Sequence, residues 1–131
     1  MGRPVAAVVL AAGSGSRFGG VKLLADLDGR PVLQHVVDAV AAAGIERIVV
    51  VLGEAADALE AAVRWPPGAA RVRNPRPAEG LASSLRVGVA AVRAGEEPEA
   101  ILVALGDQPR IVPATVRALT DAPTDRPVIL P

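Results

Sequence analysis

The chain has 131 residues, of which 51% are hydrophobic and 2% aromatic, and its 14 basic and 14 acidic side chains cancel to a formal net charge of zero. This length fits one domain with one hydrophobic core. The balanced charge provides no basic field for a nucleic acid or a membrane surface. The absence of cysteine and the single histidine exclude a disulfide framework, a thiolate metal site and a histidine-rich metal site.

Targeting segments are not expected either. No apolar run reaches the roughly 18–20 residues that cross a bilayer. Arg3 and Pro4 lead directly into a short apolar run, which is not the pattern of a signal peptide. We therefore expect a cytoplasmic protein.

Apolar, β-branched runs alternate with amphipathic segments along the chain. The predicted strands are Val5–Leu10, Arg47–Leu52, Ala70–Arg73, Ala100–Leu105 and Pro127–Leu130. The predicted helices are Pro31–Ala43, Glu54–Arg64, Ser83–Ala94 and Pro113–Leu119, with Ser83 as the N-cap of the third. This alternation predicts an α/β fold of three layers, in which helices cover both faces of a mostly parallel sheet.

The segment after the first predicted strand, LAAGSGSRFGGVK from Leu10 to Lys22, is rich in glycine and carries two cations. Glycines let backbone N–H groups approach an anion, and a compact ammonium suits a phosphate. Lys22 is the only lysine, against thirteen arginines, although a lone lysine can also be a chance survivor on a solvated loop. A P-loop would need lysine at Val21, and a dinucleotide fingerprint would need glycine at Phe18. The segment is therefore predicted to bind phosphate in another way.

Three polar segments follow predicted strands. They are Gly13–Lys22, Asn74–Ser84 and Gly106–Pro109. Ligands of open α/β sheets bind beyond the carboxyl ends of the strands, so we expect the three segments around one cleft.

Two of these segments carry residues with competing explanations. Asp107 directly follows an apolar strand, where a carboxylate suits Mg²⁺ but also forms turns and caps helices. Ser83 and Ser84 lie at a predicted helix start, where a hydroxyl caps the helix or meets a polar ligand.

Together these segments resemble one family. LAAGSGSRFGGVK followed by LDGRPVLQHVV, then Asn74-Pro75 with EGLASSL at 79–85, then LGDQP at 105–109, are similar in order and spacing to the MobA-like nucleotidyltransferases. The L-A-A-G start resembles the molybdenum cofactor cytidylyltransferase branch more than the guanylyltransferase branch. The resemblance runs from Val5 to Pro131 and implies a Rossmann-like nucleotidyltransferase fold.

The resemblance also implies an activity: Mg²⁺-dependent transfer of CMP from CTP to the phosphate of molybdopterin cofactor, with release of pyrophosphate. Arg17, Lys22 and Asp107 would be catalytic, and Asp107 would hold the metal. The nucleotide-binding residues implied are Leu10, Ala11, Ala12, Gly13, Arg17, Lys22, Asn74, Gly80, Ser83 and Ser84.

Several alternatives remain open. The acceptor can instead be that of a guanylyl- or sugar-phosphate nucleotidyltransferase. Arg71, Arg73, Arg76 and Arg86 either form a basic rim for a phosphorylated acceptor or are ordinary surface arginines. Family members continue with a G-H-P-containing segment and a second metal contact. We therefore expect residues 1–131 to form a single nucleotidyltransferase domain that lacks its C-terminal part, and a non-catalytic nucleotide-binding module is a further alternative.

Overall fold

Five parallel strands form the centre of the molecule. The computed structural model describes residues 5–12, 19–110, 113–121 and 128–129. In spatial order, the sheet consists of β5 (Ala69–Arg73), β4 (Arg47–Leu52), β1 (Val5–Ala11), β6 (Ala100–Leu105) and β7 (Val128–Ile129). Every neighbouring pair in this sheet is parallel.

Helices connect these strands. They are α1 (Gly19–Leu24), α2 (Val32–Ala42), α3 (Ala56–Ala62), α4 (Leu81–Arg93), α5 (Pro113–Asp121) and the short 3₁₀ helix η1 (Pro77–Glu79). A small antiparallel pair, β2 (Asp26–Leu27) and β3 (Arg30–Pro31), precedes α2. None of the helices in the described part of the chain is long and apolar enough to cross a membrane.

The strand order reverses direction at β1. The chain runs outward from β1 through β4 to β5, and then returns to the other side of β1 with β6 and β7. Leu10 of β1 lies in register with Val51 of β4 and Leu105 of β6, so the carboxyl ends of these three strands are level. A reversal of this kind opens a crevice between the loops that leave its two strands. The segments after β1 and β6 therefore meet at one edge.

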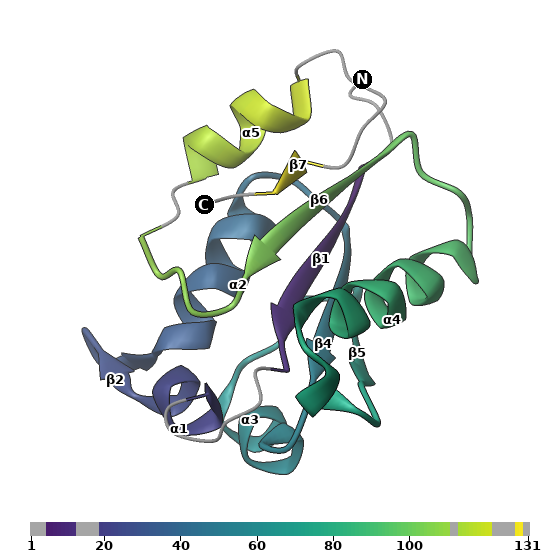
Figure 1. The fold of residues 1–131 in the computed structure, drawn as a ribbon. Helices are drawn as coiled ribbons and strands as arrows, with labels where there is room; N and C mark the ends of the chain where they lie inside the picture. The colour runs from purple at the N-terminus through teal and green to yellow at the C-terminus, as the bar shows by residue number, and fades with distance from the viewer. Residues whose placement is uncertain (1–4, 13–18, 111–112, 122–127, 130–131) are drawn as a thin grey trace.

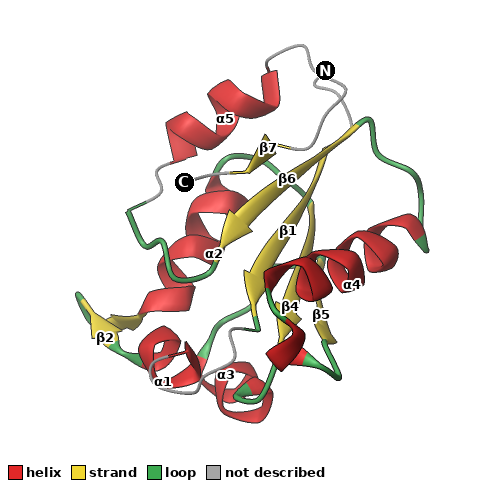
Figure 2. Cartoon of the chain, in the orientation of Figure 1, coloured by secondary structure: helices red, strands yellow, loops and turns green. Residues whose placement is uncertain are grey.

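Alternating side chains of β1 fill two apolar cores. Ala7, Val9 and Ala11 pack with α2, α3 and α5, whereas Ala6, Val8 and Leu10 pack with α4. A strand that is buried on both faces needs a continuous apolar sequence, and VAAVVLA provides it. Figure 2 shows the resulting layers, with α4 on one face of the sheet and α2 and α5 on the other.

The contact of α4 with the sheet is unusually close. A Cβ at Gly88 would lie 2.5 Å from Val8 Cγ1 and 3.0 Å from Val51 Cγ2. Glycine at this position therefore lets the helix backbone approach the sheet, where α4 crosses in front of β1 and β4 (Figure 1).

The predicted α/β fold with a mostly parallel sheet is confirmed, and its five strands are found at or within two residues of their predicted bounds. Two helix predictions are wrong in detail. Glu54–Arg64 shortens to Ala56–Ala62, and α4 begins at Leu81 rather than Ser83. The N-cap of α4 is Gly80 and no side chain caps it, because the Ser83 hydroxyl bonds Asn74 instead.

A helix and a hairpin were not predicted. Lys22 lies in the last turn of α1 and not on a loop. The helix is not predicted from the sequence because it begins with Gly-Gly, which has low helix propensity. Leu23, which is buried, and Leu24 supply the apolar contacts that stabilise it. The β2–β3 hairpin is fixed by His35, whose Nε2 lies 2.6 Å from the Leu27 carbonyl oxygen. His35 lies on a half-buried face of α2 and has this structural role.

Candidate functional site

The end of β1 forms the floor of the candidate site. Leu10, Ala11 and Ala12 are all buried, and their side chains belong to the two cores. The turn after β6 is pressed against this end, since Gly106 N donates to Leu10 O at 2.8 Å and a Cβ at Gly106 would lie 3.0 Å from that oxygen. Only backbone groups of Leu10–Ala12 are therefore available to a ligand.

The cations predicted beyond β1 are described only in part. Gly13 and Arg17 lie outside the described residues. Lys22 is exposed, and its ammonium has no hydrogen bond or ion pair within the described part of the chain. Its helix α1 packs against α2 and α3 at the carboxyl edge of the sheet (Figure 1). Lys22 is thus an exposed positive charge without a partner among the residues that the structure describes.

Asp107 lies on the neighbouring turn. It is exposed directly after β6, and its carboxylate has no partner among residues 5–12, 19–110, 113–121 and 128–129. These residues contain no cluster of three histidine, cysteine or acidic side chains. Mg²⁺ is commonly held by one or two carboxylates while water and substrate phosphates complete its shell. A lone, exposed carboxylate beside the end of β1 fits that form of site and would not suit a metal enclosed by protein ligands.

A buried polar cluster lies on the third segment. Asn74 follows β5, and its Nδ2 donates to Ser83 Oγ at 3.1 Å and to Ser84 Oγ at 3.0 Å. Its Oδ1 accepts from the backbone N–H of Arg76 at 2.9 Å. Asn74 is 4% exposed, Ser83 7% and Ser84 4%. The cluster therefore joins the end of β5 firmly to the first turn of α4.

Gly80 connects this cluster to α4. Its φ of 102° lies in the region that favours glycine, and its carbonyl accepts from Ser84 N at 3.3 Å. Hydrogen bonds within the segment from Asn74 to Ser84 thus hold it together at the carboxyl edge of the sheet. The sequence predicts that these residues lie in one segment at the carboxyl edge. It does not predict that the Asn74 side chain donates its hydrogen bonds to the two serines.

The four arginines considered as a basic rim differ in their partners. Arg71 lies 3.8 Å from Glu60 and over the Trp65 ring, Arg73 lies 2.5 Å from Asp57, and Arg76 lies 3.6 Å from Glu79. The hydrogen bond and the charge of Asp57 raise the pKa of Arg73. These three charges are therefore largely neutralised.

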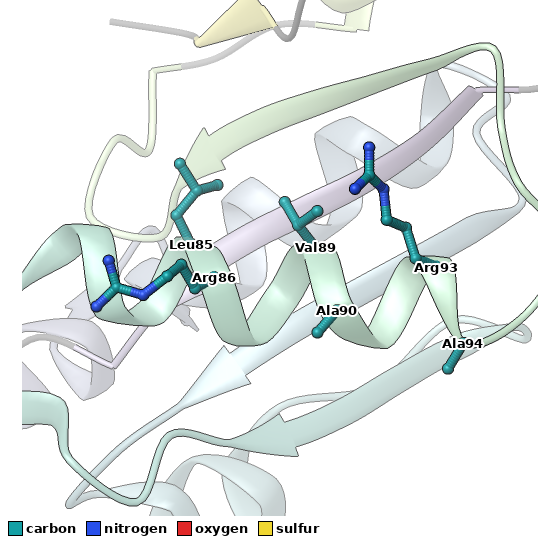
Figure 3. A pocket seen from close by; sticks show the side chains of 6 residues that line it. All are labelled: Leu85, Arg86, Val89, Ala90, Arg93 and Ala94. Atoms are coloured by element: carbon teal, nitrogen blue, oxygen red, sulfur yellow. The ribbon is translucent and has the colours of Figure 1, made fainter.

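Arg86 is the exception among the four. It is exposed on α4, and no side chain in the described ranges forms an ion pair or hydrogen bond with it. It lines a hollow of about 700 Å³ whose walls are otherwise mostly apolar, and Figure 3 shows Leu85 and Val89 beside it on the same helix.

Known proteins share this sequence and architecture. The model of the MobA-like NTP transferase domain family matches residues 7–131. The chain belongs to this family. The family predicted from the three motifs is therefore confirmed.

Relatives and solved structures agree with this assignment. Bifunctional protein GlmU of Sorangium cellulosum is 37% identical over 134 residues, which cover 97% of this chain and 28% of that protein. Rv0371c from Mycobacterium tuberculosis H37Rv is 36% identical with a TM-score of 0.79, over 93% of this chain and 61% of that one, and a further structure of that protein is a complex with manganese. A nucleotidyl transferase from Methanothermobacter, Mth528, is 37% identical with a TM-score of 0.69, over 91% of this chain and 57% of that one.

Proposed function

We propose that this chain binds a nucleoside triphosphate at the carboxyl edge of its sheet and transfers the nucleotidyl group to a phosphorylated acceptor. One observation carries the proposal. The strand order reverses at β1, and the reversal brings the end of β1, the exposed carboxylate of Asp107 and the first turn of α4 to one edge. We further propose that residues 1–131 act as a single nucleotidyltransferase domain.

The phosphates would be bound by the segment after β1. Backbone groups from Leu10 to Gly13 would receive the triphosphate, while Arg17 and Lys22 would neutralise its charge. The exposure of Lys22 and its lack of a described partner support this role, because its ammonium does not have to leave an existing ion pair. Asp107 would hold Mg²⁺, which would supply positive charge to stabilise the phosphates.

The reaction needs no covalent intermediate. A phosphate oxygen of the acceptor attacks the α-phosphorus in line, a new P–O bond forms, and the bond to the bridging oxygen breaks as pyrophosphate leaves. Negative charge grows on the departing pyrophosphate, where Arg17 and Lys22 would stabilise it. Groups placed in advance where charge develops usually supply the largest part of such a rate enhancement.

The nucleoside would lie against the Asn74–Ser84 segment. Gly80 has no side chain, so it would let the base approach the backbone at the start of α4. Ser83 and Ser84 would line the same pocket, with Asn74 behind them. The exposure of Gly80 supports this arrangement.

The acceptor is proposed on different grounds. The relatives named GlmU support a sugar phosphate better than molybdopterin. The L-A-A-G start still favours CTP as donor and molybdopterin cofactor as the second candidate acceptor. Both acceptors carry a phosphate, and we propose that Arg86 binds it, since the other three arginines of the rim are already paired.

Thermal shift and pyrophosphate release test this function together. CTP, GTP, UTP, ATP and NAD are added with and without Mg²⁺, and a ligand of the native state raises the melting temperature by mass action. We expect a Mg²⁺-dependent shift with a triphosphate and none with NAD. Release of pyrophosphate with a hexose 1-phosphate supports the sugar-phosphate acceptor, whereas release only with molybdopterin supports the second candidate. A shift without any turnover identifies a binding module, and no shift with any triphosphate contradicts the proposal.

A further inference from the structure

The amide of Asn74 is fully used inside the protein. Its two Nδ2 hydrogens go to Ser83 Oγ and Ser84 Oγ, and its Oδ1 accepts from Arg76 N at 2.9 Å and from Ser83 Oγ at 3.5 Å. A carboxamide offers two donor hydrogens and two acceptor lone pairs, and all four are occupied here. Because these four positions are occupied, Asn74 has no free polar atom with which to contact a nucleotide.

The hydroxyl groups of Ser83 and Ser84 differ in their remaining hydrogen-bonding capacity. Each hydroxyl oxygen accepts one Nδ2 hydrogen of Asn74. The Ser83 hydroxyl hydrogen returns to Asn74 Oδ1 at 3.5 Å. No such return bond exists for Ser84 within the described part of the chain, so its hydroxyl hydrogen is left to be donated elsewhere. Asn74 therefore fixes the polarity of Ser84 as that of a donor.

The register of α4 on the sheet places this donor. Gly88 packs on Val8, as its close approach shows. Ser84 lies one turn closer to the start of α4, which is about 5.4 Å along the helix or about two residues along a strand. This displacement places Ser84 toward the carboxyl edge of the sheet, near the end of β1, since Gly88 also packs on Val51, which is level with Leu10.

We infer that Asn74 is a positioning residue for the nucleoside. It holds the first turn of α4 against β5 and orients the Ser84 hydroxyl to donate to an acceptor atom of the nucleoside, such as a base carbonyl oxygen. This inference rests on the proposed function. It differs from the sequence-based expectation, in which Asn74 itself bound the nucleotide.

Inorganic tripolyphosphate separates this role from general damage to the site. It carries the phosphates of a nucleotide without the nucleoside, so it reports on the phosphate segment alone. We would measure dissociation constants of Mg²⁺-CTP and Mg²⁺-tripolyphosphate for the wild type, Asn74→Ala, Ser84→Ala and the double variant. If CTP does not bind the wild type, the triphosphate that gives the largest thermal shift replaces it.

The expected pattern is specific. Asn74→Ala and Ser84→Ala should each raise the dissociation constant of the nucleotide about tenfold, the loss of one hydrogen bond. Because Asn74 acts through Ser84, the double variant should also lose about tenfold rather than about a hundredfold. Binding of tripolyphosphate should stay within about twofold in all three. If Asn74→Ala does not fold, Ser84→Ala alone must still show the nucleotide-specific loss.

Gln34→Ala is the matched control. Gln34 is also a buried amide, 5% exposed, but it lies on α2, across the sheet from α4. Gln34→Ala should leave both dissociation constants within about twofold. Equal weakening of nucleotide and tripolyphosphate by Asn74→Ala, or multiplied effects in the double variant, would overturn the inference.

Failure of the proposed function would look different. In that case the wild type would bind neither nucleotide nor tripolyphosphate. Amide hydrogen exchange still tests the contact itself, because the Ser84 N–H is bonded to Gly80 O in the first turn of α4. Asn74→Ala should speed exchange there, and Gln34→Ala should not. Unchanged exchange in Asn74→Ala would overturn the positioning role.

Discussion

Two buried amides tie the chain together on opposite sides of the sheet. Asn74 joins the end of β5 to α4, and Gln34 joins α2 to the chain that follows α3. Gln34 Nε2 donates to Asp38 Oδ1 at 2.8 Å and to Arg64 O at 2.9 Å, and its Oε1 accepts from Arg64 N at 2.7 Å. Both side chains therefore link two elements of the fold by hydrogen bonds.

The two amides differ in their hydrogen-bond partners. Gln34 bonds to backbone groups of Arg64 and to the carboxylate of Asp38, which is itself paired with Arg30 at 2.5 Å. All the partners of Gln34 are therefore groups that serve the protein's own structure. Asn74 bonds to two hydroxyl groups, and one of them keeps a hydrogen to donate. A buried amide by itself thus indicates local rigidity, and the groups it holds indicate whether that rigidity serves a site.

The largest effects on activity should come from residues that belong to neither amide cluster. Asp107→Asn keeps the size of the side chain but removes its charge, and Lys22→Ala removes the free ammonium. Each should lower kcat/KM for nucleotidyl transfer by at least about a hundredfold, as the loss of a preorganised charge contact does. Both positions are exposed, so the melting temperature should move by no more than about 2 °C.

Measurements of pyrophosphate release and of thermal denaturation on the same samples check that activity falls while stability is unchanged. A Lys22→Ala protein that does not fold would contradict a purely functional role for Lys22. Full activity in Asp107→Asn would exclude its carboxylate from the site.

Disruption of the close contact of α4 with the sheet should have a large effect on stability. Gly88→Val inserts a branched side chain where a Cβ alone would meet Val8 Cγ1 at 2.5 Å. Overpacking of this kind costs about 1–3 kcal/mol. Displacement of α4 should also weaken nucleotide binding, because the helix carries Ser84. Ala90→Val, an exposed position on the same helix, controls for β-branching and should cost about 0.5 kcal/mol. Equal losses in urea denaturation would contradict the packing argument.

Gln34→Ala should lower stability without touching the site. It removes a buried amide and leaves Arg64 N and Arg64 O without their partner, which costs about 1–3 kcal/mol. Asn74→Ala should cost a similar amount, so the two variants match in stability and differ in nucleotide affinity. Urea denaturation of both checks the match. A Gln34→Ala protein as stable as the wild type would show that the two amides are not mechanically equivalent.

The sequence predicted the centre of the sheet well because β1, β4 and β6 are almost wholly apolar. VAAVVLA and AILVAL are buried on both faces, and composition alone identifies such segments. The carboxyl-edge rule then gathered Asp107, the Asn74–Ser84 segment and the end of β1 without the structure. Lys22 was placed on a loop because the Gly-Gly start of α1 carries no helix signal.

The cap of α4 was harder to predict. Serine at a helix start usually caps it, and Ser83 was assigned that role. The competing partner is Asn74, nine residues earlier in the chain, which takes the hydroxyl for a tertiary hydrogen bond at 3.1 Å. A contact of this kind depends on how β5 and α4 meet, and local sequence does not carry that information.

The smallest effect should come from Arg86, on the second turn of the helix that Asn74 positions. If its free guanidinium binds the acceptor phosphate, Arg86→Gln should raise the KM for the acceptor about threefold to fivefold, as expected for one exposed charge contact. The KM for the nucleotide should stay constant. Arg93→Gln is the matched control, because Arg93 lines the same hollow on α4 but is paired with Glu97 at 3.4 Å (Figure 3). Equal effects of both substitutions, lost together at high salt, would mean that α4 attracts the acceptor only by its overall charge. An effect of Arg86→Gln alone would show that the helix positioned by Asn74 contributes to the binding of both substrates.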